Sequence, residues 1–198
     1  NKGMNICMEN TLKYLFDARN FIEKKNFDAL MKLFDEHAEI INMPINGQPG
    51  YAKLLHLAAE FGNIGVCEFL ISHGADPDEF APREAYITPF MAAATSGNVE
   101  VMNFLLEKGA RIDGDPRCPS NPLLNAVRFG HCDAVVFLIK KGCDVNRLHE
   151  NLSQTAVDLA QVWGYKNIYR ALVDHGGVRA LGENIDWVNS SSGELVFT

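Results

Sequence analysis

The stretch Thr88-Pro-Phe-Met-Ala-Ala-Ala-Thr-Ser-Gly97-Asn98 decides the fold, because close variants of it occur three more times in the chain. Each variant carries a glycine at the same place, at positions 62, 97, 130 and 164, so the spacings are 35, 33 and 34 residues. Self-similarity at a nearly constant period indicates a repeat architecture. The four aligned stretches are 53–63, 88–98, 121–131 and 155–165.

A second signal keeps the same phase. Each stretch is followed by an apolar segment that closes on a further glycine, as in Phe69-Leu-Ile-Ser-His-Gly74 and Phe104-Leu-Leu-Glu-Lys-Gly109. Glycine after an apolar-periodic stretch is typical of a helix C-terminus, because it adopts the left-handed backbone without a Cβ penalty. Each unit is therefore predicted to contain two short helices separated by a turn.

The first helix of a unit has clear start signals. Pro89 and Pro122 stand where it can begin, since proline at the first helical position loses no needed N–H group. Thr88 and Thr155 can cap the free N–H groups of that first turn. One unit alone would leave half of its apolar face in water, so the units must stack. The sequence thus predicts an all-α solenoid.

Five segments carry a family resemblance: Thr88-Pro89, His56, Gly130-His131, Gly74-Ala75-Asp76 and Asp144-Val145-Asn146. Over about residues 51–177 the chain resembles the ankyrin-repeat family, whose unit recurs about every 33 residues. The resemblance implies helix-turn-helix units with hairpin-like loops. It also implies a non-enzymatic scaffold that binds a partner protein in its concave groove.

Departures from the family pattern occur in every unit. Lys53 and Asn121 replace the motif threonine, and the motif histidine is replaced by Met91, Leu124 and Asp158. We therefore expect some of the hydrogen bonds that join neighbouring loops in the family to be missing here.

The units divide the chain into successive segments. Residues 21–38 follow the apolar rhythm without the glycines, which indicates a degenerate terminal unit with a polar outer face. Beyond Gly177 the pattern is lost, and Trp187 is a candidate docking residue in that segment. The predicted segments are an N-terminal cap repeat at 1–45, four repeats at about 46–80, 81–115, 116–148 and 149–177, and a C-terminal tail at 178–198.

Composition excludes several classes of function. Eighteen Lys and Arg against 25 Asp and Glu give a net charge of −7, so we expect no nucleic-acid partner. No apolar run approaches the roughly 18 residues of a membrane span, so we expect no membrane partner. Five cysteines without a C-x-x-C pair indicate a cytoplasmic or other reducing intracellular compartment. We expect a monomer.

Catalytic and metal-binding patterns are not found in the sequence. His131-Cys132 is the one adjacent His/Cys pair, and no paired ligand spacing accompanies it. We interpret His131 as a turn residue and Cys132 as a packed apolar position, and we expect Cys67 and Cys143 to be buried. The sequence predicts no cofactor, no metal and no enzymatic activity.

Binding leaves a weaker signature in the two residues before each central glycine, which should face the concave groove. Three of these four pairs carry an aromatic residue, and Ile87 adds an apolar residue nearby. Aromatic residues and arginine are enriched in binding hot spots. The alternative is that these aromatics only cover helix ends. The pairs are Glu60-Phe61, Thr95-Ser96, Arg128-Phe129 and Val162-Trp163.

Two other functions remain open. The stack could be the targeting module of a larger enzyme or secreted effector, because the chain begins with Asn1 rather than Met and the role of its tail is unexplained. It could also be a modification substrate. Asn146, eight residues after Leu138, resembles the pattern that asparaginyl hydroxylases accept in ankyrin repeats.

Overall fold

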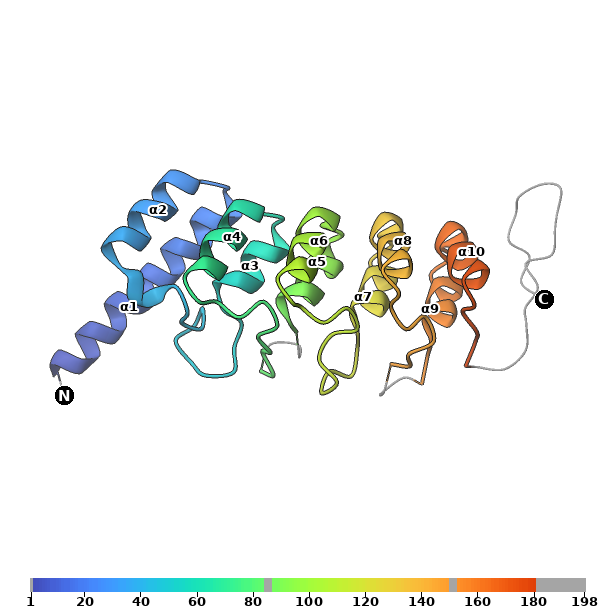
Figure 1. The fold of residues 1–198 in the computed structure, drawn as a ribbon. Helices are drawn as coiled ribbons and strands as arrows, with labels where there is room; N and C mark the ends of the chain where they lie inside the picture. Colours follow the sequence, from blue (N-terminus) through green and yellow to red (C-terminus); the bar gives the residue numbers. More distant parts are fainter. Residues whose placement is uncertain (1, 84–86, 150–152, 181–198) are drawn as a thin grey trace.

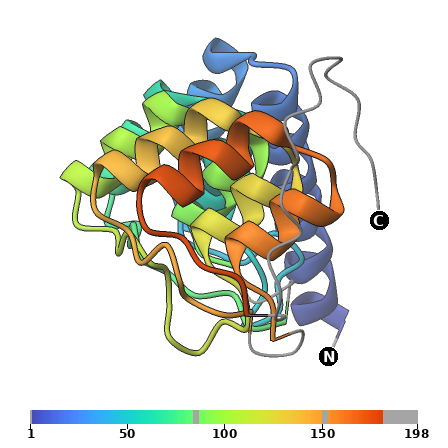
Figure 2. The same ribbon diagram turned by 90° about the vertical axis from the view of Figure 1, so that its right-hand side faces the viewer.

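The computed structural model describes residues 2–83, 87–149 and 153–180, without the side chains of residues 2–8. These residues form helix pairs that lie side by side in one row (Figure 1). Seen along the row, the helices form two layers, with the connecting loops gathered at one edge (Figure 2). The helices are α1 (Lys2–Glu23), α2 (Phe27–Glu36), η1 (Ala38–Ile40), α3 (Leu54–Glu60), α4 (Ile64–Ser72), α5 (Pro89–Ser96), α6 (Val99–Glu107), α7 (Pro122–Arg128), α8 (Cys132–Lys140), α9 (Ala156–Val162) and α10 (Lys166–Asp174).

Two layers run the length of the stack, because each helix packs on its counterpart in the next unit. The inner layer consists of α3, α5, α7 and α9, which are 7 or 8 residues long. The outer layer consists of α4, α6, α8 and α10, each of 9 residues. The predicted all-α repeat solenoid is confirmed.

Local sequence signals start the inner helices as predicted. The Thr88 hydroxyl accepts a hydrogen bond from the Met91 N–H at 3.3 Å. Asn121, which replaces threonine, does the same for the Leu124 N–H at 2.8 Å. Asparagine is as good an N-cap as threonine, so this departure from the family pattern loses no hydrogen bond at the helix start.

The turn between the two layers depends on a left-handed residue. The central glycines have φ between +68° and +73°, and the next N–H bonds back across the turn, as from Asn98 to the Ala93 carbonyl at 2.9 Å. In the cap, Lys25 takes this conformation with φ +53°, and the Asn26 N–H bonds to the Phe21 carbonyl at 2.8 Å. The degenerate N-terminal unit therefore keeps the turn of the repeats without its glycine.

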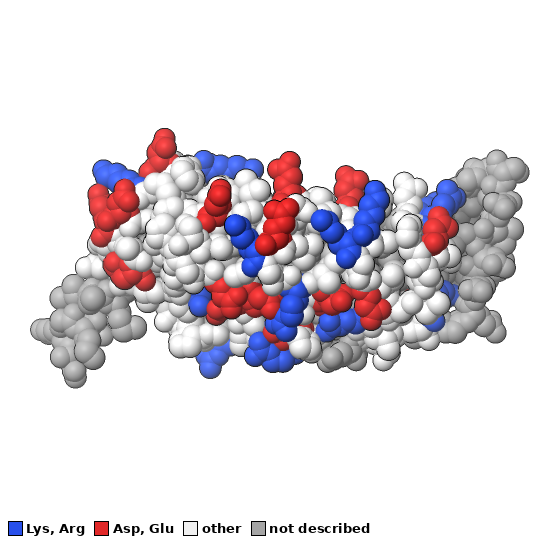
Figure 3. Space-filling view, viewed as in Figure 1, with Lys and Arg blue, Asp and Glu red and all other residues white. Residues whose placement is uncertain are grey.

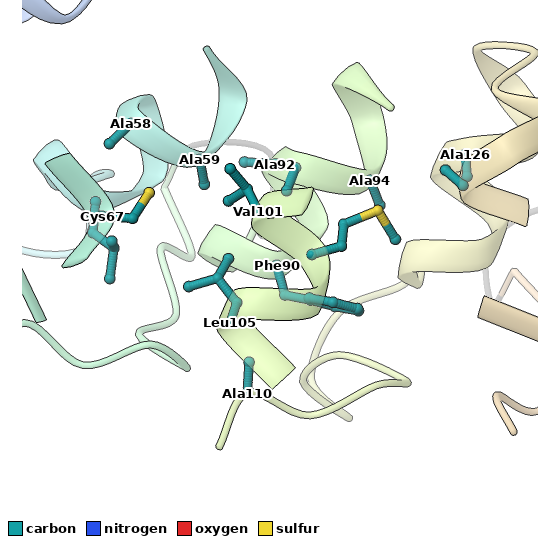
Figure 4. Packing of buried hydrophobic residues seen from close by; sticks show 14 of the residues in the cluster. Ala58, Ala59, Cys67, Phe90, Ala92, Ala94, Val101, Leu105, Ala110 and Ala126 are labelled. Atoms are coloured by element: carbon teal, nitrogen blue, oxygen red, sulfur yellow. The ribbon is translucent and has the colours of Figure 1, made fainter. Parts of the chain in front are cut away.

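One hydrophobic core runs through the row of units. Alanines such as Ala59, Ala92 and Ala126 are buried where the inner helices approach each other closely. Phe90 and Leu105 are fully buried beside them and fill the space between the two layers (Figure 4). Core residues of neighbouring units thus support one another, as expected for a stacked repeat.

The N-terminal helix α1 differs in length from the inner-layer helices. It spans 22 residues, and its buried residues Leu15, Ala18 and Ile22 recur at helical spacing and pack against α2 and α3. Phe16, on another face of the helix, is 61% exposed. The cap is therefore a long helix with one buried stripe, rather than a short copy of the repeat helix.

Candidate functional site

The residue pairs predicted to bind a partner stand at the C-terminal ends of the four inner helices. Since α3, α5, α7 and α9 lie next to one another, these ends form one row along the stack, here called the inner row. The structure thus brings together eight of the nine predicted binding residues on one layer. The inner row consists of Glu60, Phe61, Thr95, Ser96, Arg128, Phe129, Val162 and Trp163.

Exposure divides the inner row into two halves. At the C-terminal half, Phe129, Val162 and Trp163 are 55%, 69% and 57% exposed, and they are here called the apolar patch. At the N-terminal half, Phe61 is half-buried and packs against the core. Large apolar side chains exposed together mark a surface that can bind a partner, and this description fits only the patch on α7 and α9 within the inner row.

One central member of the inner row, Thr95, already has partners within the fold. The Thr95 hydroxyl donates to the Met91 carbonyl at 2.8 Å and accepts from the Asn125 amide at 3.2 Å. The His131 ring lies 2.9 Å from the Thr95 carbonyl through Nε2. Arg128, by contrast, makes no ion pair or hydrogen bond through its side chain with the described residues. Its cation is therefore available beside the apolar patch.

Ile87 lies apart from the inner row. Its carbonyl accepts from the Ala81 N–H at 2.9 Å, which closes the loop 81–87, and its side chain packs against the core. This position explains an apolar residue directly before the Thr88 cap without a partner protein. Its role in binding stays a prediction.

Asn146 lies in the loop between α8 and α9, and its side chain holds two backbone groups. Its amide donates to the Gly176 carbonyl at 3.0 Å and accepts from the Val178 N–H at 2.8 Å. Leu138, eight residues earlier, is fully buried. The amide of Asn146 thus has a structural role, while its modification stays a prediction.

Hydrogen bonds between successive loops form a ladder that sequence reasoning missed. Asp78 accepts from the Arg111 N–H at 3.2 Å, and Asp113 accepts from the Asp144 N–H at 2.9 Å. Asn146 makes the third rung. The three residues share one signal, because each stands four positions after the second glycine of its unit. Asp78, Asp113 and Asn146 thus join the loops of successive units.

Asp115 is the most strongly paired carboxylate of the loop edge. Its side chain is buried and accepts from Arg117 and Arg111, each at 2.7 Å. Hydrogen bonding to Arg117 holds the pKa of Asp115 far below its ordinary range, although burial opposes this shift. The Arg117 guanidinium also lies 4.3 Å from the centre of the Phe80 ring. These charges stabilise the loops and are not free for catalysis.

Three buried cysteines are poorly suited to nucleophilic chemistry. Burial raises the pKa of Cys67 and Cys143 to about 12 and that of Cys118 to about 11, and the thiolate is the reactive form. The predicted burial of Cys67 and Cys143 is confirmed. The described residues include no group of three His, Cys, Asp or Glu that could hold a metal ion.

The surface shows no dominant charge on the face seen in Figure 3, where Lys and Arg alternate with Asp and Glu along the stack. Within residues 2–83, 87–149 and 153–180, no helix is both long enough and apolar enough to span a membrane. The inner row is therefore marked by its exposed apolar side chains and not by charge.

Comparison with known proteins identifies the repeat. A family model described as "Ankyrin repeats (3 copies)" matches residues 22–116, and one described as "Ankyrin repeat" matches residues 118–147. The chain is 31% identical over 136 residues, 67% of its length, to the ankyrin repeat and KH domain-containing protein mask-1 of Caenorhabditis elegans. It is 34% identical over 124 residues, 62% of its length, to the ankyrin repeat domain-containing protein oryK of Aspergillus oryzae.

A third relative is named as an enzyme. The chain is 31% identical over 98 residues, 49% of its length, to the NAD-capped RNA hydrolase NUDT12 of Macaca fascicularis. The chain spans only 5% of mask-1, 18% of oryK and 21% of this hydrolase. What these sequences share with the chain is the repeat, a non-catalytic module that generally binds proteins. With its stacked helix pairs, left-handed glycine turns and matched family models, the chain belongs to the ankyrin-repeat family.

Proposed function

We propose that this chain is a non-enzymatic scaffold that binds a partner protein through the inner row, with the apolar patch as the main contact. One observation carries the proposal: Phe129, Val162 and Trp163 expose more than half of their side chains on two adjacent inner helices. Burying such aromatic surface supplies much of the binding free energy at interfaces.

The patch also indicates the chemistry of the partner. Arg128 stands beside Phe129 at the end of α7 and has no ion pair among the described residues. A carboxylate placed next to apolar side chains on the partner would pair with this guanidinium, while the apolar side chains contact Phe129 and Trp163. We therefore propose a protein segment that combines an acidic residue with large apolar residues.

A second candidate function follows from the relatives. Each of the three is several times longer than the matched region, and one is named as a hydrolase. The stack would then target a catalytic domain to its substrate, again through the inner row. Activity measurements on the chain alone and on any longer natural form would separate this candidate from a free-standing scaffold.

A matched pair of valines tests the binding surface. Val162 on α9 and Val173 on α10 are 69% and 43% exposed in the same unit, but only Val162 belongs to the inner row. The parent chain first captures a partner protein from cell extract, and this partner is then purified. Val162→Ala should weaken the binding of this partner by about fivefold. Val173→Ala should leave the affinity unchanged. Equal effects of the two variants would contradict the proposed surface.

A further inference from the structure

Residues 177–180, here called the closing segment, follow α10 and are held by the third and fourth units. Asn146 accepts from the Val178 N–H at 2.8 Å, which makes this contact the last rung of the loop ladder. The Thr155 hydroxyl donates to the Val178 carbonyl at 2.8 Å. In the earlier rungs, the N–H donor belongs to the loop of the next repeat. The closing segment thus makes for the fourth unit the contact that Arg111 and Asp144 make for the second and third units.

Asp158 holds the other half of the closing segment. It is buried in the first turn of α9, at the position where the other units have His56, Met91 and Leu124. Its carboxylate accepts from the Ala180 N–H at 3.0 Å and from the Arg179 guanidinium at 3.3 Å. Burial alone would raise the pKa of Asp158, but its hydrogen bonds, including those to Thr155 and Ala180, outweigh this and lower it.

Close packing adds to these hydrogen bonds. A Cβ atom built on Gly177 would lie 2.8 Å from the Val157 side chain and 2.8 Å from the Leu172 carbonyl oxygen. Real Cβ atoms do not approach a backbone oxygen so closely, so the position admits only glycine. The closing segment therefore lies directly on the ends of α9 and α10.

The opposite edge of the same unit differs within the described residues. Three central glycines are overlaid by a side chain from the next unit, from Asn98, His131 and Tyr165 respectively. At Gly164 no atom of the described residues lies within 4 Å of a built Cβ. In this part of the chain, the fourth unit is therefore covered at its loop but not at its turn.

We propose that residues 177–180 are a strap that ends the repeat array, and that Asp158 is the residue that positions it. The strap gives the fourth unit its rung of the loop ladder and adds the contacts with Asp158. It covers Val157 in the first turn of α9. Because its contacts are confined to the third and fourth units, the strap can open while the earlier units stay folded.

Trypsin reports on the strap directly. Arg179 is its cleavage site, and no Lys or Arg follows it in the sequence, so cleavage there releases the single fragment 180–198. In the full chain, Arg179 should be cut much more slowly than the exposed Arg83. Asp158→Asn keeps the shape but turns an acceptor into an NH2 group that faces other donors, and it should speed this cleavage about tenfold or more. Asp174→Asn on α10 makes the same charge change without touching the strap and serves as the control.

A second variant and a direct measurement keep the test decisive. Gly177→Ala should displace the strap while Asp158 stays in place, and it should speed cleavage after Arg179 to a similar extent. In the parent, the N–H groups of Val178 and Ala180 should exchange with solvent slowly, and in both variants rapidly, while circular dichroism stays that of the parent. If Asp158→Asn unfolds the stack, the cleavage rate of Gly177→Ala and the hydrogen-exchange rates of the parent still test the proposal. Cleavage in the parent as fast as at Arg83, or equal rates in the parent and Gly177→Ala, would overturn the proposal.

Discussion

The two edges of the stack hold neighbouring units together by different physical means. At the turn edge, a glycine without a Cβ makes room for one side chain of the next unit, and that side chain differs each time: Asn98, His131, then Tyr165. At the loop edge, Asp78, Asp113 and Asn146 repeat the same hydrogen bond to the next loop. Packing at the turn edge therefore depends on the space that each glycine leaves. Packing at the loop edge depends on a hydrogen-bond acceptor at one repeat position. One edge tolerates variation in the next unit, and the other requires Asp or Asn.

The largest effect should come from the core that both edges share. Leu105 is fully buried in the middle of the stack, so Leu105→Ala should lower the free energy of unfolding by roughly 2–5 kcal/mol. Chemical denaturation followed by circular dichroism measures this change. A loss below about 0.5 kcal/mol would mean that the edges, rather than the core, provide most of the stability.

Mild acid should weaken the loop edge before the turn edge. His56, beneath the loop that contains Glu79, has its pKa lowered from 6.5 to about 4 by burial, which backbone hydrogen bonds only partly offset. The unfolded chain binds the proton first, so stability falls as pH drops from about 6.5 to 4, by up to ~1.4 kcal/mol per pH unit. His56→Leu, which introduces the residue found at position 124, should remove this slope. If the free energy of unfolding changes with pH in the same way in the parent and in the variant, His56 is not the source of the slope.

Glycine-to-alanine substitutions at the turn edge should differ in how much they lower the stability, depending on which side chain lies above the glycine. A Cβ at Gly97 would lie 2.7 Å from the His131 ring, whereas one at Gly164 would meet no atom of the described residues within 4 Å, and both glycines have φ near +70°. Both alanine variants carry the backbone strain of about 1–2 kcal/mol. Gly97→Ala should cost about 1 kcal/mol more, because His131 must move. Equal losses on thermal denaturation would show that the contact with the next unit is unimportant.

A single rung of the loop ladder should have a smaller effect. Asp113→Ala removes the acceptor of the Asp144 N–H and should cost about 0.5–1.5 kcal/mol. Asp113→Asn keeps an acceptor, as Asn146 does in the next unit, and should stay within about 0.5 kcal/mol of the parent. Urea denaturation of the pair measures the difference. Identical stabilities for both variants would show that the rung is not needed.

Features encoded within one unit could be predicted from the sequence. The Thr88 cap, the left-handed glycines and the buried alanines depend on residues a few positions apart, so the sequence pattern contains all the information needed. The stack follows from them, because each unit leaves an apolar face to cover. The inner row was predicted in the same way, from its place before each central glycine.

Features that depend on neighbouring units could not be predicted. Phe61 and Phe129 hold the same position in their units, yet Phe61 packs on the core and Phe129 is exposed. The surrounding units determine which residues cover each phenylalanine. The residue type at a single repeat position does not contain this information. Asp158 was noted only as a departure from the pattern, because its partners Arg179 and Ala180 lie beyond the last repeat.

The central claim is that the apolar patch binds a protein, and a double variant tests it most directly. Phe129→Ala combined with Trp163→Ala removes two exposed side chains that make little contact with the core, so the melting temperature should stay that of the parent. Calorimetry with the purified partner should show binding weakened by about 2 kcal/mol or more, roughly 30-fold. A double variant that melts like the parent and binds with unchanged affinity would contradict the claim, and the aromatics would then be covers for helix ends.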